Sequence, residues 1–122
     1  HHGSTCLTLG MKNLMGVILD RSAIHRNLGQ RIADLTSRVR PTLTVVDAVR
    51  ILLKHGPTGG SLDDVKKMDT VIASADIVAA DSYATTLFGL TGADIAYIQA
   101  ASQMGLGQMD LRAMKIEEIN LS

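Results

Sequence analysis

The most strand-like stretch of the chain is the apolar run 42–53, which is followed by a glycine-rich loop at 55–60. Every second residue from Leu43 to Leu53 is apolar except Asp47. Alternation with a period of two predicts a β-strand, and a strand this apolar is typical of the middle of a sheet. We therefore expect residues 43–49 to form an inner strand.

Helical spacing of apolar residues predicts an amphipathic helix over residues 24–39. Its apolar positions recur every three or four residues, while arginines and Asp34 face away from them. Pro41 would stop this helix. A second helix is expected to begin at Ser74 or Asp76 and to run to about residue 88, and a third covers residues 93–104.

The remaining apolar runs favour strands. Residues 17–19 and 71–73 are short and rich in valine and isoleucine, and residues 115–119 form a last short candidate. The link between the run 42–53 and residues 71–73 is too short for a full helical crossover, so a hairpin is plausible. Strands and helices interleave, and we expect a single α/β domain with a mixed sheet of about four to five strands and packed helices.

Composition narrows the class of protein. The chain has 122 residues, a net charge of zero and three aromatic residues. It has no electrostatic footprint for nucleic acid or an anionic membrane, and no apolar run that could span a bilayer. Cys6 is the one cysteine, which allows no internal disulfide and indicates reduced cytoplasm.

The start of the chain indicates a fragment. Residues 1–4, His-His-Gly-Ser, resemble the remnant of a purification tag, and the sequence then begins in mid-pattern without a methionine. We expect residues 5–122 to be an α/β domain cut from a longer protein. An apolar surface should mark where the missing N-terminal part packs, and self-association through that surface is expected.

Asp81 is the most informative polar residue, because its helical angle places it inside an apolar face. A carboxylate there is costly unless it is paired or hydrogen-bonded. It is either a ligand-facing acid or a structural acid, with Lys12 as the first choice of partner. In both cases we expect Asp81 to be buried.

Asp47 and the glycine loop form a second candidate site. Asp47 either lies at a sheet edge, where ligands of α/β proteins gather, or bonds its own backbone as a turn residue. Gly56, Gly59 and Gly60 either present backbone N–H groups to an anion or form a plain tight turn. His25, beside the first long helix, is more typical of a surface or capping residue than of a metal ligand.

The residues also resemble a known family, catalogued as domain of unknown function 362. The resemblance is carried, in order, by 11–17 (MKNLMGV), His25, Val45-Val46-Asp47, Gly56-Pro57, Gly60, Ser74-Ala75-Asp76, 78–81 (VAAD) and Gly105-Leu106-Gly107. It implies a bacterial or archaeal cytoplasmic protein, often accompanied by ferredoxin-type iron–sulfur segments, and it looks like the C-terminal part of that domain. The family's cluster cysteines have no counterpart here, so an iron–sulfur cluster is expected only in other parts of a full-length protein. The family's motif positions fall on Lys12, Asn13, His25, Asp47, Asp76 and Asp81.

Two classes of function stay open. The first is an enzyme or redox-associated domain that binds a small anionic metabolite or cofactor through Lys12, Asn13, the glycine loop, Asp47 and Asp81. The second is a non-catalytic scaffold or interaction domain, whose buried polar residues only fix the fold. The partners expected are a small anionic ligand, the missing N-terminal part, a ferredoxin-like domain or a second copy of the chain, with neither nucleic acid nor membrane among them and no metal bound by this fragment.

Overall fold

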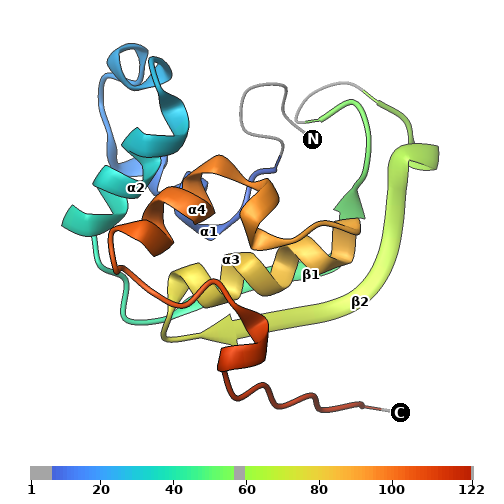
Figure 1. The fold of residues 1–122 in the computed structure, drawn as a ribbon. Coiled ribbons are helices and arrows are strands. Elements are labelled where there is room, and N and C mark those ends of the chain that lie inside the picture. The colour runs from blue at the N-terminus through green and yellow to red at the C-terminus, as the bar shows by residue number, and fades with distance from the viewer. Residues whose placement is uncertain (1–6, 57–59, 122) are drawn as a thin grey trace.

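A computed structural model describes residues 7–56 and 60–121 of the chain. Its main elements in chain order are α1 (Gly10–Asn13), α2 (Leu28–Arg38), β1 (Thr44–Leu52), β2 (Val65–Ser74), α3 (Ile77–Thr85) and α4 (Ala96–Gln103). Short 3-10 turns connect them. The strands form one long hairpin, and α3 lies against one face of it. The layer formed by α1, α2 and α4 lies on the side of α3 that faces away from the hairpin (Figure 1).

The hairpin is antiparallel, as the short link between its strands predicted. Thr44 pairs with Ser74 at one end and Leu52 with Val65 at the other. The register slips once, where Val49 faces both Met68 and Asp69. Asp69 adopts a left-handed backbone, with φ of 48°, at this bulge. A bulge bends the strand that carries it, and β2 curves around α3 in Figure 1.

The expected mixed sheet of four to five strands is wrong, because the described residues contain two strands only. Residues 17–19 form no strand, because Val17 ends a 3-10 helix (Leu14–Val17) and the two residues after it are irregular, with Leu19 fully exposed. Residues 115–119 pair with no described strand. A strand propensity describes how well residues fit a pleated, half-buried surface, and neither segment meets such a surface.

The expectation that 43–49 is an inner strand is also wrong. Among the described residues β1 pairs with β2 alone, and α3 covers one face of the hairpin, where Ala48, Ile51 and Ile72 are buried. The opposite face is open, and Val45 and Val71 on it are 59% and 62% exposed. Apolar residues on both faces of a strand indicate that each face is able to pack against other elements. They do not indicate which elements those are.

The helices agree better with the sequence. In α2, Leu28 and Ile32 are buried and the arginines point outward, as predicted. Its start differs, because Asn27 takes a left-handed backbone, so a separate 3-10 turn (Ser22–His25) precedes the helix. The helix over 77–88 stops at Gly89, with φ of 71°, and ends in a 3-10 turn.

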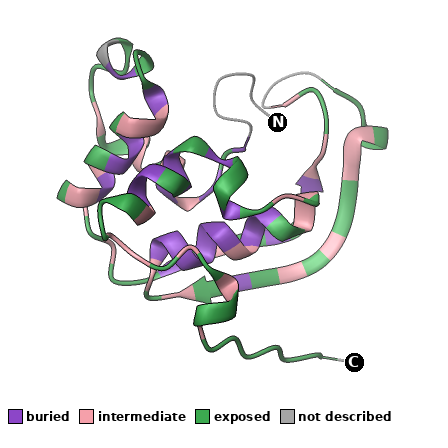
Figure 2. Cartoon of the chain, in the orientation of Figure 1, coloured by how far each residue is buried: buried purple, intermediate pink, exposed green. Residues whose placement is uncertain are grey.

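Helix α3 is the centre of the core. Eight of its nine residues are buried, all but Tyr83, which is typical of a helix surrounded by protein on every side (Figure 2). The polar residues of α3 therefore lie where ordinary cores hold apolar side chains.

In the part of the chain that the structure describes, no helix is long and apolar enough to cross a lipid bilayer.

Candidate functional site

The Asp81 carboxylate is fully buried and holds the main chain of α1. It accepts hydrogen bonds from the backbone N–H groups of Gly10 and Met11, both at 2.8 Å. The expected burial and hydrogen bonding of Asp81 are confirmed, but these donors are main-chain amides and not the Lys12 ammonium. Burial raises the pKa of Asp81 to about 7, although both N–H donors act in the opposite direction.

Asp76, at the start of α3, also binds main chain. One carboxylate oxygen accepts a hydrogen bond from the Ala79 N–H at 3.0 Å and caps the helix. The other accepts from the Gln108 N–H at 2.8 Å, which ties the segment after α4 to α3. A side chain on Gly107 would collide with the Asp76 carboxylate, so the contact requires glycine there.

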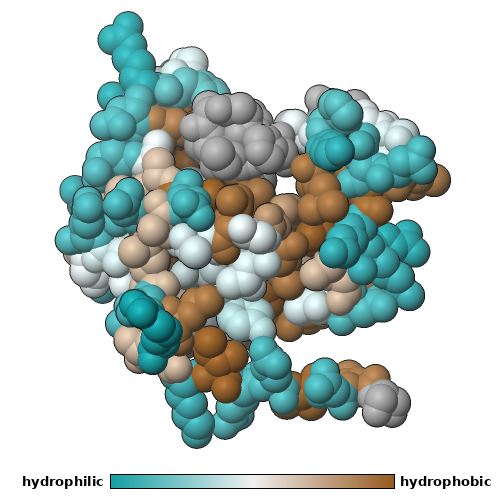
Figure 3. Space-filling model, turned by 45° about the vertical axis from the view of Figure 1, so that its right-hand side comes forward, coloured by the Kyte–Doolittle hydropathy of each residue, from teal (hydrophilic) through white to brown (hydrophobic). Residues whose placement is uncertain are grey.

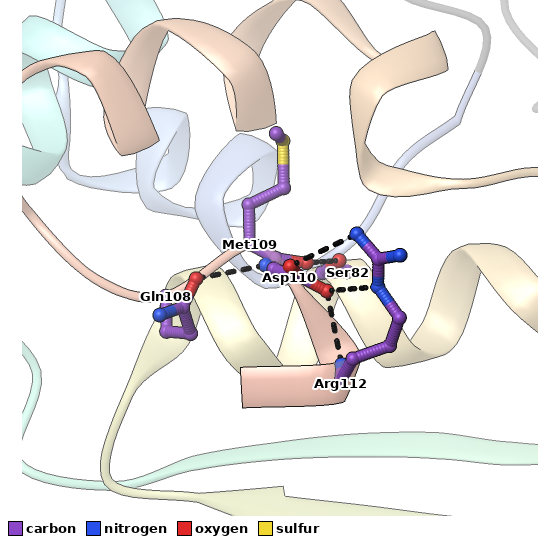
Figure 4. Close-up of polar contacts among 5 residues, drawn as sticks. All are labelled: Ser82, Gln108, Met109, Asp110 and Arg112. Carbon is purple, nitrogen blue, oxygen red and sulfur yellow. Dashed lines mark hydrogen bonds and ion pairs between the residues drawn. The ribbon is translucent and has the colours of Figure 1, made fainter. Parts of the chain in front are cut away.

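Ser82 makes a third contact of this kind, shown in Figure 4. Its hydroxyl donates to the Met109 carbonyl at 2.6 Å. Next to it, the Asp110 carboxylate accepts from the backbone and the guanidinium of Arg112 at 3.0–3.2 Å. These bonds hold the pKa of Asp110 below its ordinary value, and the bonds from the Arg112 guanidinium have a larger effect than the bond from its backbone N–H. Asp76, Asp81 and Ser82 thus attach two distant segments to one buried helix, which is a structural role.

The candidate site is a cleft of about 290 Å³ between the N-terminal segment, β1 and the end of α3, which we call the β1 cleft. Its walls are mostly apolar, and Leu9, Ile51 and Phe88 contribute to them. Asp47 and Arg50 of β1, together with Gly56, also line it. On one face of the molecule, apolar side chains gather where the surface is hollowed, between hydrophilic flanks (Figure 3).

Asp47 combines the two alternatives that the sequence left open. Its Oδ1 accepts a hydrogen bond from the Val49 N–H at 2.9 Å, which is the turn-forming behaviour of an aspartate. It nevertheless lines the β1 cleft, and a carboxylate has further lone pairs for a ligand. The bulge lies beside it, and bulges commonly re-aim neighbouring side chains.

Arg50 is the cleft residue that the sequence interpretation missed. Strict alternation would place it on the face opposite Asp47, yet both residues line the cleft. Burial along β1 departs from alternation after Ala48, since Val49 and Arg50 are both exposed and Ile51 is buried. Asp69, a residue that tolerates left-handed backbone, was the available signal of the bulge.

The glycine loop is divided between the cleft and a turn. Gly56 lines the cleft, Gly59 lies outside the described residues, and Gly60 has a φ of 127° that favours glycine. The turn closes around Asp64, whose Oδ2 lies 3.0 Å from both the Ser61 N and the His55 Nδ1. These contacts lower the pKa of Asp64, and the hydrogen bond from the Ser61 N–H has the largest effect.

The other candidate residues do not line the β1 cleft. Lys12 and Asn13 belong to α1, where partial burial lowers the pKa of Lys12. His25 is exposed on the turn before α2. The structure therefore brings together Asp47 and Gly56 of the nine candidates, and adds Arg50.

Two other hollows have less to recommend them as ligand sites. One of about 390 Å³ lies between β2, α3 and residues 114–120, and contains none of the nine candidate residues. One of about 230 Å³ contains Asp76 beside Arg40, but Asp76 already uses both oxygens on main-chain donors. Of these three hollows, the β1 cleft is the one whose lining is more apolar than polar, and it holds two of the nine candidate residues, Asp47 and Gly56.

Metal ligands also need to lie close together in space. No three His, Cys, Asp or Glu side chains of the described residues come together in a way that could hold a metal ion. Cys6 lies outside those residues. We therefore assign no described residue to a metal or an iron–sulfur cluster.

Comparison with known proteins places the chain in a family. A family model described as "Domain of unknown function (DUF362)" matches residues 1–86, which include all nine candidate residues but not Gly105-Leu106-Gly107. A thylakoid-associated protein of Synechocystis sp. is 24% identical over an alignment of 114 positions, which covers 86% of this chain and 35% of that protein. The chain thus spans about a third of the length of that relative, and no solved structure matches it. With most of its length covered by the family model, the chain belongs to the DUF362 family.

Proposed function

We propose that this chain is a ligand-binding domain, and that the β1 cleft takes a small anion with an apolar part. The observation that carries the proposal is the meeting of Arg50 and Asp47 in a cleft with apolar walls. Small-molecule sites typically combine apolar walls with a few polar groups that orient the ligand. The cleft volume, about 290 Å³, suits a ligand at the small end of the usual range.

Each cleft residue has a distinct role in this proposal. The Arg50 guanidinium binds a carboxylate or phosphate, for which its planar fork of N–H donors is suited. The Asp47 carboxylate accepts a hydrogen bond from a hydroxyl or amide of the same ligand. Leu9, Ile51 and Phe88 pack on the apolar part and exclude water, which strengthens the charged contact.

The test uses three probes of equal chain length, namely hexanoate, hexylammonium and hexanol. Chemical shifts of Ala48 and Phe88 should respond to hexanoate most strongly, and Arg50→Gln should remove that preference. Lys66→Gln is the matched control, because Lys66 is an exposed cation opposite Ile51 in the hairpin. Equal responses to hexanoate and hexylammonium, or an unchanged response in Arg50→Gln, would refute the proposal.

The second candidate is a non-catalytic scaffold or interaction domain. It is favoured by Asp76 and Asp81, because both carboxylates are occupied by hydrogen bonds from main-chain N–H groups and so act within the fold. On this proposal the open face of the hairpin receives the remainder of a longer family protein, a ferredoxin-like domain or a second copy. Sedimentation of wild type and Val45→Lys/Val71→Lys tests self-association, which the double variant should abolish without loss of helix content.

Location is a proposal too. The relative's name says that it is associated with thylakoids, which are membranes, whereas the single cysteine of this chain suits reduced cytoplasm. A cytoplasmic protein that reaches a membrane surface is compatible with both. Cell fractionation of the tagged protein in its native host would distinguish a soluble pool from a membrane-bound one.

A further inference from the structure

We propose that the segment 14–40, which we call the basic lobe, docks on an anionic lipid surface. The lobe comprises the turns that precede α2 and the helix itself. Its first part, residues 14–27, begins with the 3-10 helix Leu14–Val17 against α1 and α2 and then rises beyond α2 at the upper left of Figure 1, and most of it is exposed in Figure 2. The inference is independent of the ligand proposed for the β1 cleft.

Charge is segregated in this chain although its sum is zero. The basic lobe carries five arginines, Arg21, Arg26, Arg31, Arg38 and Arg40, against two acids, Asp20 and Asp34, and so has a charge of +3. The remaining residues therefore sum to −3. All five arginines are exposed. A net charge of zero for the whole chain hides this excess in one segment, whose potential acts over about 8–10 Å at physiological salt.

The two acids of the lobe, which the charge of +3 already counts, are held by local hydrogen bonds. Asp20 accepts hydrogen bonds from the backbone and the hydroxyl of Ser22, at 3.0 and 2.6 Å, and these bonds lower its pKa. Asp34 accepts from the Gln30 amide at 3.0 Å. Both contacts are local and leave three arginines in excess.

Apolar side chains protrude from the same lobe. Leu19 is 106% exposed, and Val17 is 63% exposed, whereas Ile24 and Leu28 of the lobe are buried in the core. Leu19 lies two residues before Arg21, so an apolar tip and a cation adjoin in the sequence. Exposed apolar residues beside arginines are typical of surfaces that insert shallowly at a membrane, with cations on the lipid phosphates.

An anionic lipid surface fits this combination better than an acidic protein does. Leu19 is fully exposed, which suits a fluid layer that closes around it, whereas a protein partner would need a matching pocket. The described residues hold no membrane-spanning helix, so the contact would be peripheral and reversible.

The test is sedimentation of the 122-residue protein with vesicles of phosphatidylcholine alone or mixed with phosphatidylglycerol. We expect binding to the mixed vesicles that weakens with salt, and little binding to phosphatidylcholine alone. Arg21→Gln and Arg26→Gln should each weaken binding about fivefold, from about 1 kcal/mol per cation near the surface. Leu19→Ser should weaken it by a similar factor or more.

Controls make the outcome decisive. Leu62→Ser and Lys54→Gln change an exposed leucine and an exposed cation outside the lobe, and both should bind like wild type. Circular dichroism would verify that all variants fold. The proposal fails if wild type ignores the mixed vesicles, if the controls weaken binding equally, or if Leu19→Ser has no effect while charge changes do. The last result would indicate non-specific attraction, which an acidic protein partner could share.

Discussion

The Asp81 carboxylate accepts a 2.8 Å hydrogen bond from the main-chain N–H of Gly10, which lies 71 positions earlier in the chain. Together with the bond from the Met11 N–H, it fixes the start of α1 against the central helix. A buried acid, considered without its hydrogen-bond partners, would be a catalytic candidate. Here its two hydrogen bonds join α3 to the start of α1.

Asp81→Ala should lower the free energy of unfolding by at least about 2 kcal/mol, because it leaves two buried N–H donors without an acceptor. Chemical denaturation at constant pH measures the effect. Asp63→Ala, at an exposed acid, is the control and should change stability by less than about 0.5 kcal/mol. Equal stability of the Asp81 and Asp63 variants would show that the two hydrogen bonds contribute nothing.

Stability should fall as pH rises from about 4 to 7. The folded-state pKa of Asp81 is raised from 3.8 to about 7, so in this range the folded protein holds a proton that the unfolded chain has lost. The slope is at most about 1.4 kcal/mol per pH unit, or about 4 kcal/mol in all. Above pH 7 both states are ionised and this contribution becomes constant.

Asp81→Asn isolates that effect, since asparagine does not titrate. The difference between the wild-type and Asp81→Asn unfolding profiles should slope downward between pH 4 and 7. Asp20, Asp64 and Asp110 have lowered pKa values, and their contributions disappear only as pH falls through those values. They are common to both proteins and cancel. Parallel profiles would contradict the raised pKa.

Gly107→Ala should destabilise the protein by about 1–3 kcal/mol, the usual cost of forcing a methyl group into a packed site. The new Cβ would meet the Asp76 carboxylate and, at 2.8 Å, the Cβ of Val78. Gly16→Ala is the matched control, because no atom lies within 4 Å of the added methyl group. Thermal melts that rank the two variants alike would count against the close approach.

Asp69→Gly should stabilise the hairpin by up to about 1 kcal/mol. Asp69 holds a left-handed backbone at the bulge, which costs an ordinary L-residue energy that glycine does not incur. Asp69→Ala should act in the opposite direction, since alanine lacks the polar side chain that helps aspartate tolerate this conformation. A higher melting temperature for the alanine variant than for the glycine variant would refute the assignment of strain.

The sequence was sufficient where the signal was local. The spacing of Ile24, Leu28 and Ile32 located α2, and the angle of Asp81 on its helix predicted the burial. The helix expected over 93–104 is α4, and the turn before it is capped by the Asp94 carboxylate, which accepts from the Thr91 N–H at 2.8 Å. In each case one helix decides the outcome, because helical hydrogen bonds and faces are set within the element.

Sheet pairing was less predictable, because it depends on partners. The runs at 17–19 and 115–119 have strand-like side chains but no described strand beside them. Arg50 lines the cleft together with Asp47, although strict alternation would place the two on opposite faces of β1. Lys12 was chosen for its charge, whereas the observed partners of Asp81 are amide groups that any sequence possesses.

The hydrogen bonds that Asp76, Asp81 and Ser82 make to the main chain of other segments also limit which substitutions this family domain can accumulate. Asp76 binds the N–H of residue 108, Asp81 those of residues 10 and 11, and Ser82 the carbonyl of residue 109. Every amino acid offers a carbonyl, and every one but proline offers an N–H. In a saturation library these contacts would therefore exclude proline at 10, 11 and 108 while remaining indifferent to the side chain at exposed Gln108. Gly10 and Gly107 would be restricted by size, because an added Cβ would lie 2.9 Å from the Asp81 Oδ1 at Gly10 and would collide with the Asp76 carboxylate at Gly107.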